Sequence, residues 1–112
     1  MKKFKTINGY TKKQMIRFFK DYNTGKRCIL DWGDCLYSDG KGNHCAVGCF
    51  IPDDHPGMNF VGGVRHLLWE HPELESVMPL STEGMLKLQM VHDTCRGNTI
   101  EAMVDWVDEN VE

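Results

Sequence analysis

The chain has 112 residues, of which 41% are hydrophobic and 26% are charged, and its formal net charge is −3. This length and composition predict one globular domain (residues 1–112) with a modest core, and they exclude a disordered chain. No apolar run approaches the roughly 18 residues that a membrane span needs. No apolar signal-peptide core follows the basic start, so we expect a cytoplasmic protein without a membrane partner.

The charge is distributed unevenly along the chain. Residues 1–27 hold nine Lys or Arg residues and one acid, Asp21, which gives +8, whereas the remaining residues total −11. A basic end on an acidic body permits contact with nucleic acid or another anion through the first helix. The alternative, which we favour, is that the two ends complement each other within one molecule or between subunits.

The first predicted element is an amphipathic helix between Thr11 and Gly25. Thr11 is typical of an N-cap, and Gly25 stands where a glycine is expected to follow a helix. Apolar and basic residues recur at helical spacing on opposite faces. The apolar face holds Met15, Phe18, Phe19 and Tyr22, and the basic face holds Lys12, Lys13, Arg17 and Lys20. The aromatic residues favour a core over a surface on which bases stack, and nucleic-acid contact by the basic face stays the lesser alternative.

The middle of the chain predicts a small β-hairpin. Residues 35–37 are strand-like, and we expect them to pair with residues 43–45 across a turn that contains two glycines. A short helical segment can follow before Pro52 ends it. Gly48 in this segment suits a close backbone approach, either by a packed neighbour or by a ligand.

Helical patterns fill most of the remaining sequence. One helix is expected between Asn59 and Pro72, although two glycines weaken its first turns. A second runs from the N-cap Ser81 to Arg96, and a third begins after Asn98. The predicted fold class is therefore α+β, a mostly helical single domain with one small β-hairpin.

The cysteines predict free thiols and no cofactor, with zinc as an alternative. An odd number, five, in a cytoplasmic chain argues against a disulfide framework. Zinc takes four Cys or His ligands, and two pairs at helical spacing would supply them. The candidate ligands are Cys45, Cys49, His92 and Cys95. Because no C-x-x-C motif is present, a zinc-stabilised interaction module is an alternative to the main interpretation.

A second alternative is a hydrolase of a nucleotide-like substrate. Cys45 or Cys49 would be its nucleophile and His92 its base. Adjacent side chains on a helix point in different directions, so we do not expect Asp93 to orient His92. The sequence has no nucleophile elbow, P-loop or dinucleotide fingerprint, and it therefore favours a protein that is not an enzyme.

The polar residues predict a small ligand pocket. Gln89, His92 and Asp93 share one face of a helix and would face residues 45–54. Such a pocket would suit a nucleotide-like or phosphorylated ligand. The candidate binding residues are Tyr37, His44, Cys45, Gly48, Asp53, Arg65, Gln89, His92 and Asp93. The alternative is structural: Gln89 and His92 would satisfy backbone groups, and Asp93 would pair with an arginine, Arg65 or Arg96.

Two motifs carry a resemblance to a known family. The first is Cys35-x-Tyr37, a polar turn with glycine, C-A-V-G-C at residues 45–49 and P-D at 52–53; the second is L-Q-x-x-H-D at residues 88–93. The pattern resembles a family of small uncharacterised proteins of bacteriophages and bacteria. The resemblance implies a phage-type accessory protein in the cytoplasm of a bacterial host. By analogy with that class, it would bind a small, nucleotide-like ligand or a host protein and so counter host defence.

The methionines and tryptophans suggest a further contact. Seven methionines and three tryptophans in a short chain can provide an adaptable apolar surface, although they more often fill a core. A homo-oligomer would use the same residues, and symmetric dimers are the commonest assembly. We therefore expect a homo-oligomer, with a small molecule or a host protein as the other partner.

Overall fold

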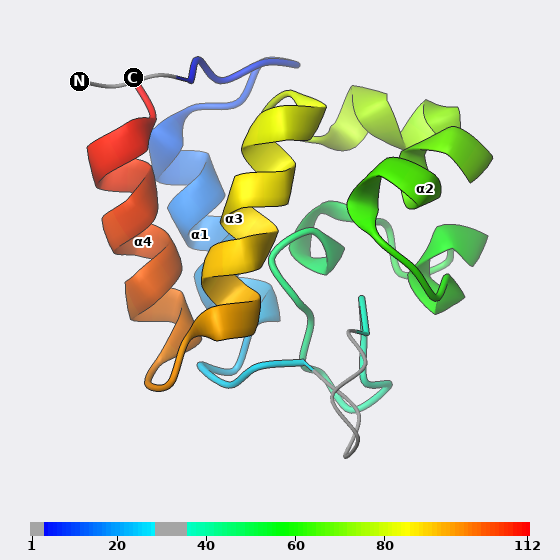
Figure 1. Cartoon of the computed structure of the whole chain (residues 1–112), viewed down its shortest axis with the longest axis horizontal. Coiled ribbons are helices and arrows are strands. Elements are labelled where there is room, and N and C mark those ends of the chain that lie inside the picture. The colour runs from blue at the N-terminus through cyan, green and yellow to red at the C-terminus, as the bar shows by residue number, and fades with distance from the viewer. Residues whose placement is uncertain (1–3, 29–35) are drawn as a thin grey trace.

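The structure, a computed structural model, describes residues 4–28 and 36–112. Its elements in chain order are α1 (Lys12–Tyr22), the 3-10 helices η1 (Gly48–Phe50) and η2 (Pro56–Asn59), α2 (Val64–Glu70), the 3-10 helix η3 (Pro72–Val77), α3 (Thr82–Thr94) and α4 (Thr99–Asn110). The helix α4 packs against both α1 and α3, and α2 with η3 stands to one side of them (Figure 1). Among the described residues, no helix is long and apolar enough to cross a membrane.

The expected β-hairpin is wrong, and the described fold is all-helical. The only ladder contacts in residues 4–28 and 36–112 are two isolated bridges, one of which joins Ser38 to His44. The backbone N–H of His44 donates to the carbonyl of Tyr22, at the end of α1, over 3.0 Å. This N–H points away from Ser38, so it takes nothing from the pairing. The pairing is limited to the hydrogen bonds from Asp39 to Asn43 and from Cys45 to Tyr37 beside the bridge, because the chain turns into η1 directly after Cys45. Cys35, in the predicted first strand, lies outside the described residues.

The helix α1 begins as predicted and ends earlier. Thr11 and Gln14 form a reciprocal capping box, with N–H to side-chain oxygen distances of 2.9 and 3.2 Å between their heavy atoms. The helix stops at Tyr22, and Asn23 is its C-cap. Asn23 Oδ1 accepts hydrogen bonds from the N–H of Gly25 and the hydroxyl of Thr99, which joins the end of α1 to the start of α4.

The helices α3 and α4 begin at the N-cap residues that the sequence predicts. The hydroxyl of Ser81 and the side chain of Asn98 accept the first free N–H groups of α3 and α4, as expected. The helix predicted after Asn59 begins only at Val64, because Gly62 takes a φ of +142° that no helix contains. Glycine adopts this conformation without steric cost, so the first turns of the predicted helix do not form.

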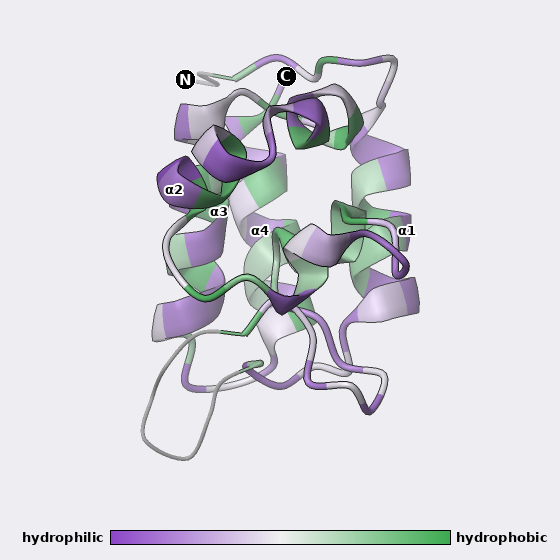
Figure 2. Ribbon diagram, turned by 90° about the vertical axis from the view of Figure 1, so that its right-hand side faces the viewer, coloured by the Kyte–Doolittle hydropathy of each residue, from purple (hydrophilic) through white to green (hydrophobic). Residues whose placement is uncertain are grey.

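The core lies where α1, α3 and α4 meet. Met15 and Phe19 of α1, Leu88 of α3 and Met103 of α4 are fully buried in it. Hydrophilic and hydrophobic residues alternate along these helices, as expected for helices with one buried face (Figure 2). From the sequence, the methionines could have formed either part of the core or an apolar surface for a partner. Most of the described ones are buried in the core, whereas Met90 of α3 is exposed.

Candidate functional site

The predicted patch of Gln89, His92 and Asp93 is a buried hydrogen-bond network. Gln89 Oε1 accepts the backbone N–H of Val47 over 3.0 Å, and His92 Nε2 accepts that of Cys28 over 3.1 Å. His92 is 0% exposed. The two side chains satisfy N–H groups that would otherwise be buried without an acceptor. The structural alternative for Gln89 and His92 therefore describes their observed contacts.

Asp93 orients His92, contrary to the expectation for adjacent residues. Asp93 Oδ1 lies 2.8 Å from His92 Nδ1 and 2.8 Å from Gln89 Nε2. Because His92 Nε2 accepts a hydrogen bond, the proton of the neutral ring is on Nδ1, and it donates to Asp93. Gln89, one turn earlier, donates to the same carboxylate oxygen and so holds it beside Nδ1 of the ring. Among the described residues, neither Arg65 nor Arg96 forms an ion pair with Asp93; Arg27 donates to its backbone carbonyl over 3.2 Å.

The predicted cysteine chemistry has no support in these contacts. Burial raises the pKa of the Cys49 thiol, and the neighbouring Cys28 adds to the effect. A nucleophile must be a thiolate, so a buried neutral thiol is a poor one. Cys45 is also fully buried, and its sulfur accepts the N–H of Gly48. Both ring nitrogens of His92 are engaged, which leaves it no lone pair for a substrate.

The four candidate zinc ligands do not gather. In the part of the chain that the structure describes, they form no group of three whose ligand atoms come within reach of one ion. His92 points into the core, whereas Cys95 is the C-cap of α3, is partly exposed and accepts the N–H of Gly97. His92 and Cys95 would share one face of a continuous helix. Because α3 ends at Thr94, Cys95 is outside the helix and the two side chains do not lie together.

Three further predicted binding residues are placed apart from any common pocket. A Cβ on Gly48 would overlap the carbonyl oxygen of Tyr37, so the close approach at this glycine is by a packed neighbour. Tyr37 is buried and donates its hydroxyl to Gly62 over 2.7 Å. Arg65 is exposed on α2. His44 and Asp53 are the predicted residues that do line a shared cavity.

This cavity, the polar pocket, has a volume of about 380 Å³. Its lining residues are Ser38, Gly40, Gly42, His44, Asp53, Met58 and Asn59. His44 is held on both sides: Nδ1 lies 2.8 Å from the Tyr22 carbonyl and Nε2 lies 3.2 Å from Asp53 Oδ1. The Asp53 side chain is 78% exposed, so its remaining acceptor positions face the pocket and solvent.

An aromatic cleft of about 250 Å³ adjoins the polar pocket. It is lined by Tyr10, Phe18, Tyr22, Cys49, Phe50, Ile51, Pro52, Asp53 and Val77. Phe18 stacks on Phe50 with ring centroids 5.1 Å apart, and Tyr10 meets Phe50 edge to face. Tyr22 is 39% exposed and meets His44 edge to face. Asp53 lines both cavities, so we call the aromatic cleft and the polar pocket together the Asp53 site.

A third hollow, the basic groove, follows the outer face of α1. Its volume is about 440 Å³, and its lining residues are Thr11, Lys13, Gln14, Ile16, Arg17, Lys20 and Asp21. Lys13 and Lys20 make no ion pair with any described residue. Arg17 Nε lies 3.9 Å from Asp21 in an exposed pair. These cations are therefore available to an anionic partner.

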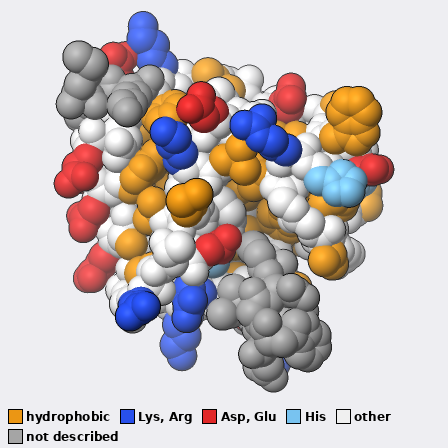
Figure 3. All heavy atoms as spheres, viewed as in Figure 1, with side chains coloured by type: hydrophobic (Ala, Val, Ile, Leu, Met, Phe, Trp, Pro, Cys, Tyr) orange, Lys and Arg blue, Asp and Glu red, His pale blue; other side chains and the backbone are white. Residues whose placement is uncertain are grey.

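Other charges pair between the two ends of the chain. Lys12 Nζ lies 3.8 Å from Asp108 of α4, and Lys5 Nζ lies 4.0 Å from Glu112. Acidic side chains gather along the edge of the molecule that α4 forms (Figure 3). The interpretation of complementary ends thus holds for these two pairs and leaves the basic groove unneutralised.

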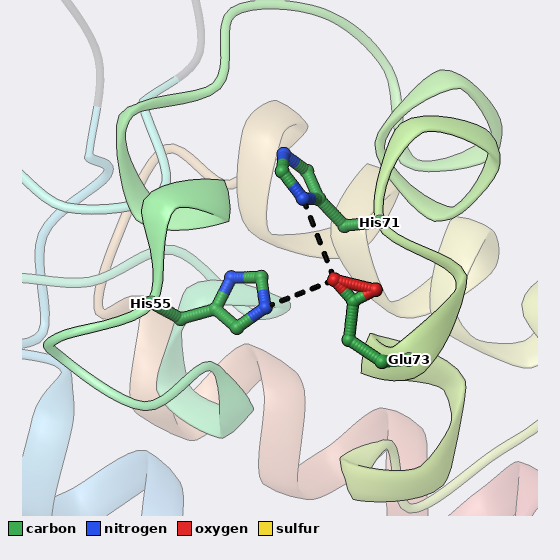
Figure 4. A group of neighbouring side chains, drawn as sticks. All are labelled: His55, His71 and Glu73. Atoms are coloured by element: carbon green, nitrogen blue, oxygen red, sulfur yellow. Dashed lines mark hydrogen bonds and ion pairs between the residues drawn. The ribbon is translucent and has the colours of Figure 1, made fainter.

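The sequence reasoning missed a cluster of His55, His71 and Glu73. Glu73 Oε1 lies 3.3 Å from His55 Nε2 and 3.5 Å from His71 Nδ1 (Figure 4). One ligand atom of each residue lies within 4.8 Å of the others, which makes the cluster a possible metal-binding group. The signal in the sequence was a repeated His-Pro dipeptide, since each histidine directly precedes the proline that opens a 3-10 helix.

The hydrogen bonds of His55 argue against a metal there. The backbone N–H of Gly57 donates to His55 Nδ1 over 2.9 Å, so the proton of the neutral ring is on Nε2 and donates to Glu73. A metal on Nε2 would move that proton to Nδ1, where it would face the Gly57 N–H. The ring nitrogens of His55 thus already have hydrogen-bond partners. We call the cluster of His55, His71 and Glu73 the clamp, because it joins η2 to η3.

Comparison of the chain with protein-family models, with curated protein sequences and with solved structures gives no match.

Proposed function

We propose that the protein is a non-enzymatic binding protein whose ligand carries a flat, nucleobase-like ring held in the Asp53 site. The observation that carries this proposal is that one exposed carboxylate, Asp53, lines both an aromatic cleft and a polar pocket. Flat rings bind to aromatic side chains through stacked or edge-to-face contacts. A carboxylate only accepts hydrogen bonds when ionised, so it selects ring edges that donate N–H groups.

The fixed surroundings of Asp53 support this role. His44 Nδ1 donates to the Tyr22 carbonyl at the end of α1, and Nε2 donates to Asp53 when both ring nitrogens carry a proton. Met58 provides an apolar wall, and Ser38 lies opposite in the turn. Cavities of a few hundred Å³ with mixed lining are typical of small-molecule sites. The pocket therefore offers a charged acceptor, Asp53, that His44 holds in a fixed direction.

The same contacts favour binding over catalysis. The thiols of Cys45 and Cys49 are buried, and His92 is locked into its network. Ser38 and His44 both line the polar pocket, but the Ser38 hydroxyl contacts the N–H of Gly40 whereas the His44 ring contacts Tyr22 and Asp53, so this imidazole is not placed to activate the hydroxyl. The resemblance to small phage and bacterial proteins supports an accessory role, in which the protein sequesters a ligand of the host cell.

The test is calorimetric titration with the nucleosides and nucleoside monophosphates of all four bases. Each base donates at least one N–H group, so we expect guanine, whose edge donates two neighbouring N–H groups to one carboxylate, to bind best, and we expect Asp53→Asn to weaken this binding about tenfold or more. Asp54→Asn is the matched control, because it removes the same charge at the next residue, which lines neither cavity. Equal affinity in wild type and Asp53→Asn would refute the proposed site.

A second candidate function is association with another protein through the region around Trp69. Trp69 is 81% exposed and Val61 is 70% exposed. Large hydrophobic side chains are visible at the end of the molecule that carries α2 (Figure 3). Tryptophan is enriched among residues that dominate interfaces, so its exposure favours a contact with a partner.

A further inference from the structure

We infer that the ligand of the Asp53 site is a single-stranded oligonucleotide, with one base in the aromatic cleft and its phosphates along the basic groove of α1. This inference rests on the proposed function, because it names the ligand of the same site. It joins two features that the sequence kept apart, namely the aromatic face and the basic face of one helix.

The cleft and the groove lie on neighbouring faces of the same helix, α1. Phe18 and Tyr22 line the cleft, whereas Lys13 and Lys20 line the groove. Successive helical residues turn by about 100°, which places Arg17 beside the lysines, and Gln14 and Asp21 between the cations and the aromatic residues. The helix lies at the edge of the molecule, so its outer side is open to a long ligand (Figure 2).

The charges of the groove suit a phosphate backbone. Lys13 and Lys20 lie two turns apart, about 10 Å along the helix axis, and neither has an ion-pair partner among the described residues. Arg17 shares only an exposed pair with Asp21, and such pairs contribute little. The chain as a whole is acidic, so this groove is a local positive region that directs an anion to the cleft.

The cleft selects a single strand over a duplex. A base can enter a cavity of about 250 Å³ and contact its aromatic lining only when it is unstacked from its neighbours. The N–H groups that Asp53 would accept are also those that a base pair occupies. Combined stacking and charge is the usual mode of single-strand recognition. Three cations predict that log K falls with log salt with a slope of roughly −2.

The experiment is fluorescence anisotropy with a labelled single-stranded octamer of mixed sequence, as DNA and as RNA, over a range of salt. The competitors are the matched duplex, inorganic polyphosphate and the mononucleotides. The test variant is Lys13→Gln/Arg17→Gln/Lys20→Gln. The control variant, Arg65→Gln/Lys87→Gln/Arg96→Gln, loses the same charge from the other elements. Circular dichroism of each variant shows that the helices remain.

We expect the octamer to bind more tightly than any mononucleotide, and the α1 triple variant to lose roughly tenfold or more of this affinity together with most of the salt slope. The control triple variant keeps both. Equal competition by duplex or polyphosphate would overturn the inference, since charge alone would then explain binding. Mononucleotides that bind as tightly as the octamer would also overturn it while leaving the proposed function intact. If the wild-type protein binds neither the octamer nor any mononucleotide, this inference and the proposed function are both rejected.

Discussion

At the scale of single residues, Gly48 shows how tightly the segment after the turn packs. The position of its Cβ is occupied by the carbonyl oxygen of Tyr37, which belongs to the backbone and cannot rotate away. Gly48→Ala should therefore lower the free energy of unfolding by roughly 1–3 kcal/mol, as overpacking does. Urea denaturation monitored by circular dichroism measures this change.

The control for Gly48 is Gly97→Ala. No atom lies within 4 Å of a Cβ at Gly97, so the same substitution meets open space. We expect a change within about 0.5 kcal/mol there. If Gly48→Ala were as mild as the control, the packing of residues 36–50 would differ from that described.

At the scale of elements, the clamp between η2 and η3 has a pH dependence of known sign. A hydrogen bond from its own backbone N–H outweighs partial desolvation and lowers the pKa of Glu73 below 4.5, and His55 and His71 add to the effect. Because the folded-state pKa is the lower one, this contribution to stability is present above about pH 4.5 and is lost as the pH falls through the folded-state pKa. Glu73→Gln should remove it.

Unfolding by urea at pH 7 and at pH 4 measures this contribution. Wild type should lose more stability than Glu73→Gln between the two values, whereas Glu70→Gln, in the exposed pair with His66, should follow wild type. Addition of zinc should leave the midpoint unchanged at pH 7, because His55 keeps its hydrogen bond to Gly57. A zinc-dependent rise of the midpoint that Glu73→Gln abolishes would show instead that the cluster binds metal.

The elements also show what local sequence can and cannot predict. The caps of α1, α3 and α4 depend on residues three positions apart, so their side-chain chemistry is readable from the sequence. The expected hairpin stops at one bridge because the chain turns into η1 after Cys45, and the outward N–H of His44 donates to the Tyr22 carbonyl 22 positions earlier. Gln89 likewise meets Val47 across 42 positions. Such partners follow from the packing of helices, which no local pattern specifies.

At the scale of the whole molecule, the region around Trp69 combines a protruding side chain with a hollow. Trp69 and Arg65 line a cavity of about 190 Å³ that shares Leu68, Glu75 and Thr82 with a more apolar cavity of about 230 Å³. A symmetric dimer places the same patch on both subunits. Trp69 of one copy would enter the hollow of the other, and Arg65 would face Glu75 across the axis. We propose that the partner in the second candidate function is a second copy of this chain.

Sedimentation velocity over a range of protein concentrations tests this pairing. Trp69→Ser should shift wild-type dimers to monomers, because it removes a residue type that often contributes 2 kcal/mol or more to an interface, about a thirtyfold change in the dissociation constant. Met90→Ser is the control, since Met90 is also exposed, at 64%, but lines neither cavity. Arg65→Glu should weaken the dimer, and Arg65→Glu combined with Glu75→Arg should restore it. A wild-type protein that stays monomeric at high concentration would leave the exposed Trp69 to a partner of another kind and refute self-association.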